Sequence, residues 1–249
     1  MSLSLGLVGA GGRMGQAIAA LAPAQGVDIA GGIGRDGALP GGHADLAHLA
    51  AACDVLVDFS APAALPLTLA AAEAAGTPVV IGTTGLRAED HARIDAAARR
   101  MPVLQTANTS LGVNLLRRLV EQAARALGPD WDIEIVEMHH RHKLDAPSGT
   151  ALLLGAAANR GRGVEHDRFD RMQAGPHPRE EGGVYYASLR GGSVAGDHQV
   201  IFAGEGERIE FGHRAESRAI FARGALVAAR WLVGRPAGRY TMDDVLGLP

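Results

Sequence analysis

The chain has 249 residues, of which 34 are glycine, and its formal net charge is −3. Glycine makes up about 14% of the chain, roughly twice its average share. The near-even charge balance lacks the basic stripe of a nucleic-acid-binding domain. No apolar run reaches the roughly 18 residues of a membrane-spanning helix, and the start lacks the charged region of a signal peptide. Composition therefore predicts a cytosolic globular protein without a nucleic-acid or membrane partner, and it leaves the glycine excess unexplained.

The first hundred residues alternate short apolar runs with helical patterns. Strands are expected at Leu3–Val8, Val27–Ile33, Val55–Phe59, Pro78–Ile81 and Val103–Thr106. Helices are expected after the first strand as far as Leu21, and at Ala44–Ala52, Pro62–Ala75 and Glu89–Arg100. Strands that alternate with helices predict right-handed crossovers and a parallel sheet, so the fold class is α/β.

The pattern changes in the second half of the chain. The expected elements are a helix at Leu111–Leu127, a half-buried strand at Trp131–Met138, a helix at Thr150–Ala158, a long loop at Asn159–Gly183, strands at Val184–Leu189, His198–Phe202 and Arg208–Phe211, and a helix at Ser217–Val233. Glycine turns between the last three strands favour antiparallel pairs. We expect two domains, one formed by residues 1–110 and 221–249 and the other inserted at 111–220.

A glycine-rich turn joins the first strand to the first helix, with glycines at 9, 11, 12 and 15. Such a turn lets the backbone approach a pyrophosphate, and the helix N-terminus offers N–H groups and the positive end of its dipole. Arg13 can add a charge to a phosphate. A plain tight turn is the alternative, but the position after an N-terminal strand favours a dinucleotide site.

The end of the second strand bears on the choice of dinucleotide. A carboxylate there usually binds the ribose of NAD, whereas this chain has Gly34 followed by Arg35. The missing carboxylate removes repulsion toward a 2′-phosphate, so NADPH should be tolerated. Asp36 lies slightly late in the chain but could still reach a hydroxyl, and Arg35 could equally be a solvated loop charge.

Side chains that can bind an anion or transfer a proton are most concentrated in the run His139-His-Arg-His-Lys143. This run is followed by Asp145-Ala-Pro-Ser-Gly-Thr150. Five consecutive residues that are or can be cationic favour a nearby anion. Ser148, Gly149 and Thr150 fall at a helix N-terminus, which suits a carboxylate. Histidine is poised for proton transfer near neutral pH. The run therefore predicts a small anionic substrate.

Three other interpretations of the histidine run stay open. Three close histidines could hold zinc, although no carboxylate or thiolate partner completes a recognisable zinc spacing. The loop could be solvated and bind nothing. A nucleic-acid patch is disfavoured by the net charge of −3. We expect no metal.

Three segments together resemble the bacterial dihydrodipicolinate (4-hydroxy-tetrahydrodipicolinate) reductase family. They are the glycine turn at 9–15, Gly82-Thr-Thr-Gly85, and the run from Glu137 to Thr150, which is the most specific of the three. The resemblance implies a reductase of the lysine and diaminopimelate pathway that uses NADPH or NADH. It also implies a cytosolic homotetramer, with a Rossmann-like nucleotide domain and an inserted mixed α/β domain for substrate binding and tetramerisation.

The resemblance assigns roles to particular residues. His139 would be the catalytic acid/base and Lys143 the proton donor. The carboxylates of the dicarboxylate substrate would be held by His140, Lys143, Ser148, Gly149 and Thr150. The cofactor would be bound by Gly9, Ala10, Gly11, Gly12, Arg13, Met14, Arg35, Gly82, Thr83, Thr84, Thr106, Ala107, Asn108 and Thr109.

Three positions depart from common family residues. Gly34 stands where many relatives have an acidic residue, and Ala61 where some have a basic one, which leaves the preference between NADH and NADPH open. Thr109 replaces a frequent phenylalanine and can alter nicotinamide packing. The competing functional hypotheses are another dehydrogenase of amino-acid precursors and a non-catalytic NAD(P)-binding regulator.

Overall fold

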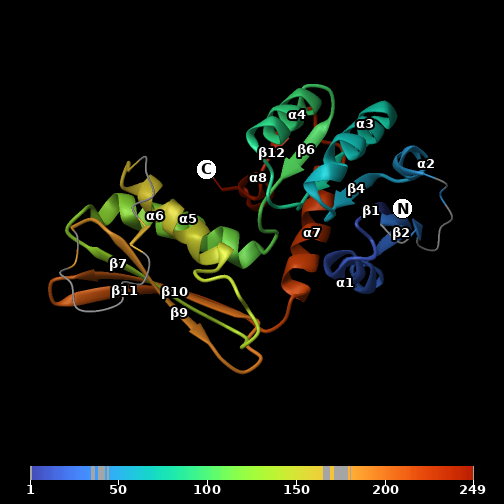
Figure 1. The fold of residues 1–249 in the computed structure, drawn as a ribbon. Coiled ribbons are helices and arrows are strands. Elements are labelled where there is room, and N and C mark those ends of the chain that lie inside the picture. Colours follow the sequence, from blue (N-terminus) through green and yellow to red (C-terminus); the bar gives the residue numbers. More distant parts are fainter. Residues whose placement is uncertain are drawn as a thin grey trace. The chain divides into compact units, whose positions relative to one another are not determined.

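The computed structural model describes residues 2–34, 37–38, 43, 45–164, 169–170, 179 and 181–248. The chain divides into two compact units, one formed by Met1–Leu111 with Ala219–Pro249 and the other by Gly112–Arg218 (Figure 1). The first break therefore follows residue 111, where the sequence suggested 110, and the chain returns at 219, where it suggested 221. Within the described residues, no helix has the length and apolar character needed to cross a membrane.

The first unit contains a seven-stranded sheet. Its order is β12 (Gly238–Tyr240), β6 (Pro102–Gln105), β5 (Val79–Ile81), β4 (Val55–Asp58), β1 (Leu3–Val8), β2 (Val27–Gly34) and β3 (Gly37–Ala38). All neighbouring strands are parallel except β3, which pairs antiparallel with β2. The predicted parallel sheet is thus confirmed. The order reverses at β1, and ligands of such sheets bind outside the carboxyl ends of the strands at this point.

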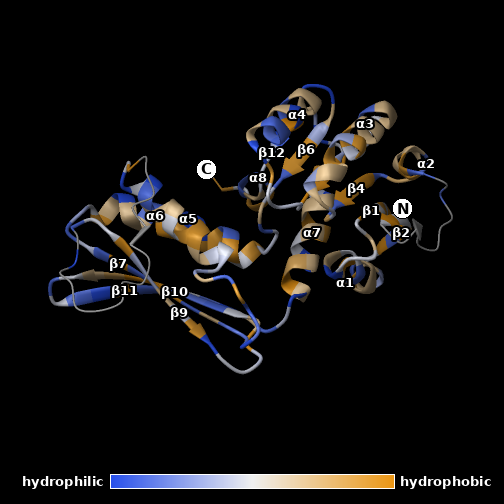
Figure 2. Cartoon of the chain, in the orientation of Figure 1, coloured by the Kyte–Doolittle hydropathy of each residue, from blue (hydrophilic) through white to orange (hydrophobic). Residues whose placement is uncertain are grey.

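Helices cover both faces of this sheet because its strands are apolar on both sides. Figure 2 shows β4 and β6 in hydrophobic colours. Val55 and Val57 of β4 pack on one face with α1 (Arg13–Leu21) and α7 (Ala219–Leu232), whereas Leu56 between them packs on the other. That second face is covered by α2 (Leu46–Ala51), α3 (Leu65–Ala75) and α4 (Ala88–Ala98). Short 3-10 turns at Pro23–Gln25 and Pro62–Ala64 precede β2 and α3, and α8 (Met242–Leu246) follows β12.

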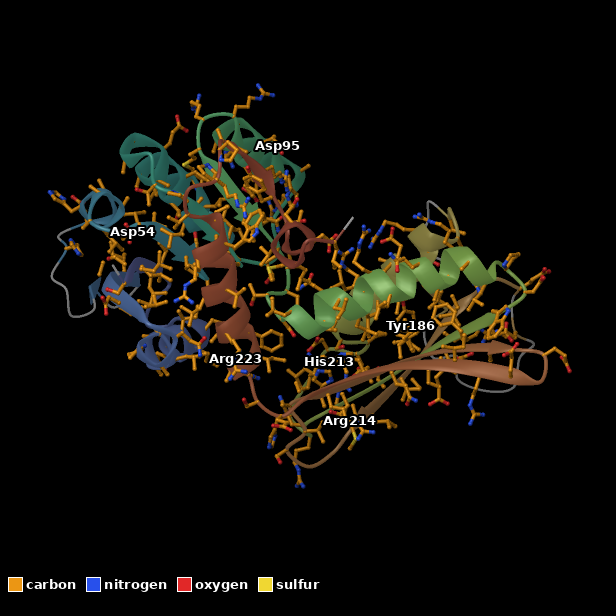
Figure 3. The ribbon with its side chains drawn as sticks, turned by 180° about the vertical axis from the view of Figure 1, so that it is seen from behind. Asp54, Asp95, Tyr186, His213, Arg214 and Arg223 are labelled. Carbon is orange, nitrogen blue, oxygen red and sulfur yellow. The ribbon has the colours of Figure 1, made fainter. Side chains whose placement is uncertain are left out.

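The second unit contains a mixed five-stranded sheet. Its order is β11 (Glu207–Ala215), β10 (Gly196–Gly204), β7 (Asp132–His139), β9 (Val184–Arg190) and β8 (Phe169–Asp170). The helices α5 (Leu111–Leu127) and α6 (Gly149–Gly161) pack on one face, around Ile133, Ile135 and Phe202. Tyr186 reaches from β9 toward α6, and it lies between helix and sheet in Figure 3.

Two expectations for the second half of the chain were wrong, one of them only in part. β10 and β11 are antiparallel as predicted, but β9 runs parallel to β7 and β8. The connection from β7 to β9 includes a whole helix, and such crossovers join parallel strands. The expected loop at Asn159–Gly183 is wrong in part, because α6 extends to Gly161 and β8 lies within the loop; residues 165–168, 171–178 and 180 lie outside the described residues. β3, β12 and α8 were not predicted from the sequence.

Candidate active site

The glycine turn after β1 is required by close packing. Gly9 has a φ of +84°, and a Cβ there would lie 2.5 Å from the carbonyl oxygen of Phe59. A Cβ on Gly15 would lie 2.5 Å from the carbonyl oxygen of Gly9. These two glycines therefore let α1 pack directly on the turn and let the turn pack on the end of β4.

The turn leaves the N-terminus of α1 open to an anion. Gly12 caps the helix without a side-chain hydrogen bond, and the first turn holds no acidic residue. An open cavity of about 730 Å³ adjoins the turn. Its lining is Val8, Gly9, Gly11, Gly12, Ile33, Gly34, Phe59, Ser60, Ala61, Ala63 and Ala64. The cavity thus lies at the carboxyl ends of β1, β2 and β4, where a dinucleotide is expected to bind.

A second cavity of about 340 Å³ is lined by five separate segments of the first unit. It is lined by Arg13, Met14, Phe59, Ser60, Gly82, Thr83, Thr84, Ala107, Asn108, Thr109 and Phe221. Eight of these eleven residues carry a predicted cofactor role. Phe59 and Ser60 line both cavities. The lining offers hydroxyl and amide groups beside apolar surface, a combination that suits a nicotinamide ring with its carboxamide.

Asp58 organises the loops around these cavities. It is fully buried at the end of β4. Its Oδ1 accepts hydrogen bonds from the backbone N–H of Ser60 at 2.8 Å and from the hydroxyls of Ser60 at 2.6 Å and Thr83 at 3.0 Å. One carboxylate oxygen therefore ties the loop after β4 to the loop after β5.

Three predicted cofactor residues are not in the lining of either cavity. Arg35 lies outside the described residues. Ala10 is fully buried and packs in the core of the first unit. The hydroxyl of Thr106 donates to the carbonyl oxygen of Asn108 at 2.7 Å, and it accepts from the Asn108 N–H at 3.1 Å. Thr106 therefore shapes the loop that presents Asn108.

In the second unit, β7 carries the predicted acid/base residue on its buried face. Alternate residues of the strand point inward, so Glu137 and His139 continue the row formed by Ile133 and Ile135. Glu137 is fully buried and His139 is 9% exposed. The alternation that builds the apolar core thus ends in two ionisable side chains.

Glu137 is surrounded by donors. Both of its oxygens accept from the Arg190 guanidinium, at 2.7 and 2.9 Å, and Oε2 lies 2.5 Å from Nδ1 of His139. The backbone N–H of Ser148 donates to Oε1 at 3.3 Å. Burial alone would raise the pKa of Glu137, but the hydrogen bonds from Arg190 and His139 outweigh it and leave the pKa below its ordinary value. The carboxylate is therefore ionised near neutral pH.

The predicted proton donor lies in the loop after β7. Nζ of Lys143 forms an ion pair with Asp145, at 2.9 and 2.8 Å from the two carboxylate oxygens. Lys143 holds the pKa of Asp145 below its ordinary value. Partial burial, and then the positive charge of Arg218, lower the pKa of His140. The loop therefore presents one lysine cation and a histidine that is neutral near pH 7.

Ser148, Gly149 and Thr150 form the N-terminus of α6, as predicted. Ser148 is the N-cap, and its Oγ accepts from the N–H of Ala151 at 3.2 Å. The same Oγ lies 2.9 Å from Nε2 of His198, a buried residue of β10. A Cβ on the exposed Gly149 would meet nothing within 4 Å, so the surface beside the first turn is open. Among the described residues, no group of three or more His, Cys, Asp and Glu side chains is arranged to hold a metal ion.

Several candidate functional residues were not predicted from the sequence. Phe59 and Ser60 directly follow a strand of the parallel sheet, which is a position that the carboxyl-end rule could have indicated. Glu137 continues the inward row of its strand, which is also visible in the sequence. Arg190, His198 and Phe221 carry no local signal, because pairing and packing between distant segments bring them to their sites.

The doubly wound sheet, with its glycine turn and the cavities at its carboxyl edge, places the chain among the nicotinamide-dependent oxidoreductases. More specifically, the chain belongs to the dihydrodipicolinate reductase family. Residues 3–109 match the family model "Dihydrodipicolinate reductase, N-terminus", and residues 112–246 match "Dihydrodipicolinate reductase, C-terminus".

Individual proteins of this family are similar to the chain over nearly its whole length. The chain is 60% identical to the 4-hydroxy-tetrahydrodipicolinate reductase of Zymomonas mobilis over 99% of this chain and 98% of the relative. It is 50% identical to the enzyme of the same name from Parvibaculum lavamentivorans, over 97% of each chain. A dipicolinate-bound dihydrodipicolinate reductase from Paenisporosarcina sp. TG-14 shares the fold, with a TM-score of 0.80, 22% identity and coverage of 97% of this chain and 98% of that chain.

Proposed function

We propose that the chain catalyses the NAD(P)H-dependent reduction of the 4-hydroxy-tetrahydrodipicolinate precursor to tetrahydrodipicolinate, in lysine and diaminopimelate biosynthesis. The observation that carries this proposal is the cluster around β7, where His139, Lys143 and the N-terminus of α6 occur together in one unit. The near full-length likeness to named reductases supports it. The substrate is a cyclic dicarboxylate that loses water to give an unsaturated imine conjugated with its carboxylates.

The first unit has the residues to hold a dinucleotide. The uncapped N-terminus of α1, without an acidic residue in its first turn, fits a pyrophosphate, and Arg13 adds a positive charge. The second cavity, with Thr83 and Thr109 in its lining, fits the nicotinamide. When bound, the reduced cofactor supplies a hydride to the electrophilic ring carbon. Because Gly34 places no carboxylate at the end of β2, we propose that both NADH and NADPH are used.

The second unit has the residues to hold a dicarboxylate. Gly149 and Thr150 lie in the first turn of α6, where the helix dipole favours an anion. Ser148 fixes this turn through its capping bond. Lys143 adds a point charge in the preceding loop, and the neutral His140 can donate one hydrogen bond. These groups anchor and orient the substrate carboxylates.

The side chains proposed to transfer the proton are those of His139 and Lys143. Reduction moves electron density into the substrate ring, and a general acid must supply a proton to it. The Nδ1 of His139 is committed to Glu137, so its Nε2 is the nitrogen available for the transfer. Lys143 can donate a proton once the substrate displaces Asp145 from its ammonium group.

The assembly and location of the protein are part of the same proposal. We infer a cytoplasmic homotetramer, as the family resemblance implies. The sheet of the second unit has one face covered by α5 and α6, and Leu189, 51% exposed, lies on its other face. Contact between subunits on this face would remove the half-exposed leucine from water. Light scattering at several protein concentrations measures the oligomeric state.

The decisive experiment is an assay of NADH and NADPH oxidation with freshly prepared substrate. The wild type should turn over with at least one cofactor, whereas His139→Gln and Lys143→Ala should lose about 10²–10⁴-fold in kcat. His142→Gln, an exposed change in the same loop, is the matched control. Nucleotide binding in calorimetry without any turnover would instead support the non-catalytic regulator.

A further inference from the structure

Glu137 is a fully buried carboxylate that takes no part in the proposed reaction steps. Its two oxygens receive two bonds from Arg190, one from the Ser148 amide and one from His139. Buried ion pairs are often no more stabilising than apolar side chains of the same size. Stability alone therefore does not account for an ionised group at this place.

The contact with His139 determines where the imidazole carries its proton. An ionised carboxylate can only accept hydrogen bonds. The nitrogen 2.5 Å from Oε2, Nδ1, must therefore donate, and Nε2 is left as the nitrogen that gains or loses a proton. Because both oxygens are also bound to Arg190, the carboxylate cannot rotate away from the ring.

The Nε2 edge of His139 is kept clear by a glycine. A Cβ on Gly196 of β10 would lie 3.0 Å from Nε2. His198, also on β10, packs edge-on against His139, with ring centroids 5.2 Å apart. The ring is thus held at Nδ1 and supported along one side, and Gly196 places no side-chain atom against Nε2.

The same carboxylate reaches the anion-binding end of α6. Oε1 accepts the N–H of Ser148, the N-cap residue, while Arg190 also donates to the carbonyl oxygen of Asp145 at 2.7 Å. The ion pair of Glu137 and Arg190 therefore supports three parts of the site: His139, the N-terminus of α6 and the loop that carries Lys143.

We propose that Glu137, held by Arg190, is a positioning residue that fixes the tautomer and orientation of His139 and aligns it with the N-terminus of α6. This inference rests on the proposed function, because it takes His139 as the general acid. The charged or titratable groups around the pair are Arg190 on β9, His198 on β10, and His140 and Lys143 in the loop after β7. Glu137 itself touches no substrate in this scheme.

The test compares Glu137→Gln with Glu134→Gln in the full-length enzyme. Glu134 is on the same strand and also pairs with an arginine, Arg179, but it points to the opposite face. We expect Glu137→Gln to lower kcat about 10²-fold and to move the alkaline fall in kcat to lower pH, because the imidazolium loses its carboxylate partner. We expect Glu134→Gln to change neither quantity. Glu137→Asp, which keeps the charge, should recover part of the loss.

A second readout does not depend on turnover. Nitrogen NMR of the labelled histidines should show His139 protonated at Nδ1 in the wild type and a mixture of tautomers in Glu137→Gln. If the unpaired Arg190 prevents folding, the double variant Glu137→Gln/Arg190→Gln removes both charges and should give the same kinetic and NMR result. An unchanged pH profile and tautomer in a folded variant overturns the proposal, whatever its kcat. A wild type without turnover but with the Nδ1–H tautomer counts against the proposed function alone.

Discussion

Lys143 and Asp145 form a two-pronged ion pair, with Nζ 2.9 and 2.8 Å from the two carboxylate oxygens. The proposed proton donor is therefore already bound to an anion that belongs to its own loop. A substrate carboxylate that uses Lys143 has to compete with Asp145 for the same ammonium group.

Replacing Asp145 with asparagine should tighten the binding of dipicolinate about two- to fivefold. The side chain of Asp145 is 63% exposed, so water screens the pair and only a modest gain is expected. Calorimetric titration with dipicolinate measures the change. Asp132→Asn, which breaks an exposed pair with Arg179, is the control and should leave the affinity unchanged. Weaker binding in Asp145→Asn would mean that Asp145 holds Lys143 in its productive position.

Local periodicity was enough to predict the five main strands of the first unit and the glycine turn. The strands are buried on both faces and bounded by glycine and proline, which is a signal contained in a few consecutive residues. The direction of β9 was not predictable in this way. The direction of β9 depends on the crossover through α6. The residues of β9 themselves carry no pattern that specifies which strands pair with it.

The missed site residues show the same limit. Arg190 and His198 reach Glu137 because β9 and β10 pair with β7 in a register that sets Arg190 opposite His139 and His198 opposite Glu137. Phe221 reaches the second cavity because α7 packs against the loop that holds Thr109. Such contacts depend on tertiary packing across fifty residues or more, so the sequence gives no local sign of them.

The burial of His198 should make the protein less stable as the pH falls from 6.5 to 4. Burial, and then the charge of His139, lower the pKa of His198 to about 4. The unfolded chain, with a histidine pKa near 6.5, binds more protons in this window, so the free energy of unfolding decreases as pH falls. The contribution is at most about 3 kcal/mol.

Urea unfolding at a series of pH values measures this effect. His198→Gln should be less stable than the wild type at pH 7.5, and the difference should narrow toward pH 4.5, because the variant has no imidazole to protonate. His142→Gln, at an exposed position, should follow the wild-type curve. A constant difference between His198→Gln and the wild type across the series would contradict the linkage.

Replacing Gly224 with alanine should disturb both folding and the second cavity. A Cβ at this position of α7 would lie 1.7 Å from the carbonyl oxygen of Thr109, so the helix and the loop would have to separate. The Thr109 hydroxyl, which donates to the carbonyl oxygen of Phe221 at 2.8 Å, lies in the same contact. We expect a loss of about 1–3 kcal/mol in stability and weaker NADH binding. Thermal unfolding and fluorescence titration test this, with Val227→Ala on the exposed side of α7 as control.

Position 34 should control the choice between NADH and NADPH. Gly34 ends β2 and lines the larger cavity, and a Cβ there would lie 3.2 Å from the backbone nitrogen of Gly11. In Gly34→Asp, the new carboxylate can accept a hydrogen bond from a ribose 2′-hydroxyl but repels a 2′-phosphate. The ratio of kcat/KM for NADPH to that for NADH should fall at least about tenfold, which is a difference of roughly 1.4 kcal/mol between the new hydrogen bond to NADH and the new repulsion of NADPH.

Gly34→Asn separates charge from size in this prediction. Asparagine fills the same space without a charge, so it should lower kcat/KM for both cofactors alike and leave their ratio near the wild-type value. The shift in Gly34→Asp should also weaken as salt is added, because the repulsion is exposed to solvent and is screened. Equal ratios for the two variants would show that position 34 does not face the 2′ position of the ribose, and the discrimination would then have to lie elsewhere in the lining.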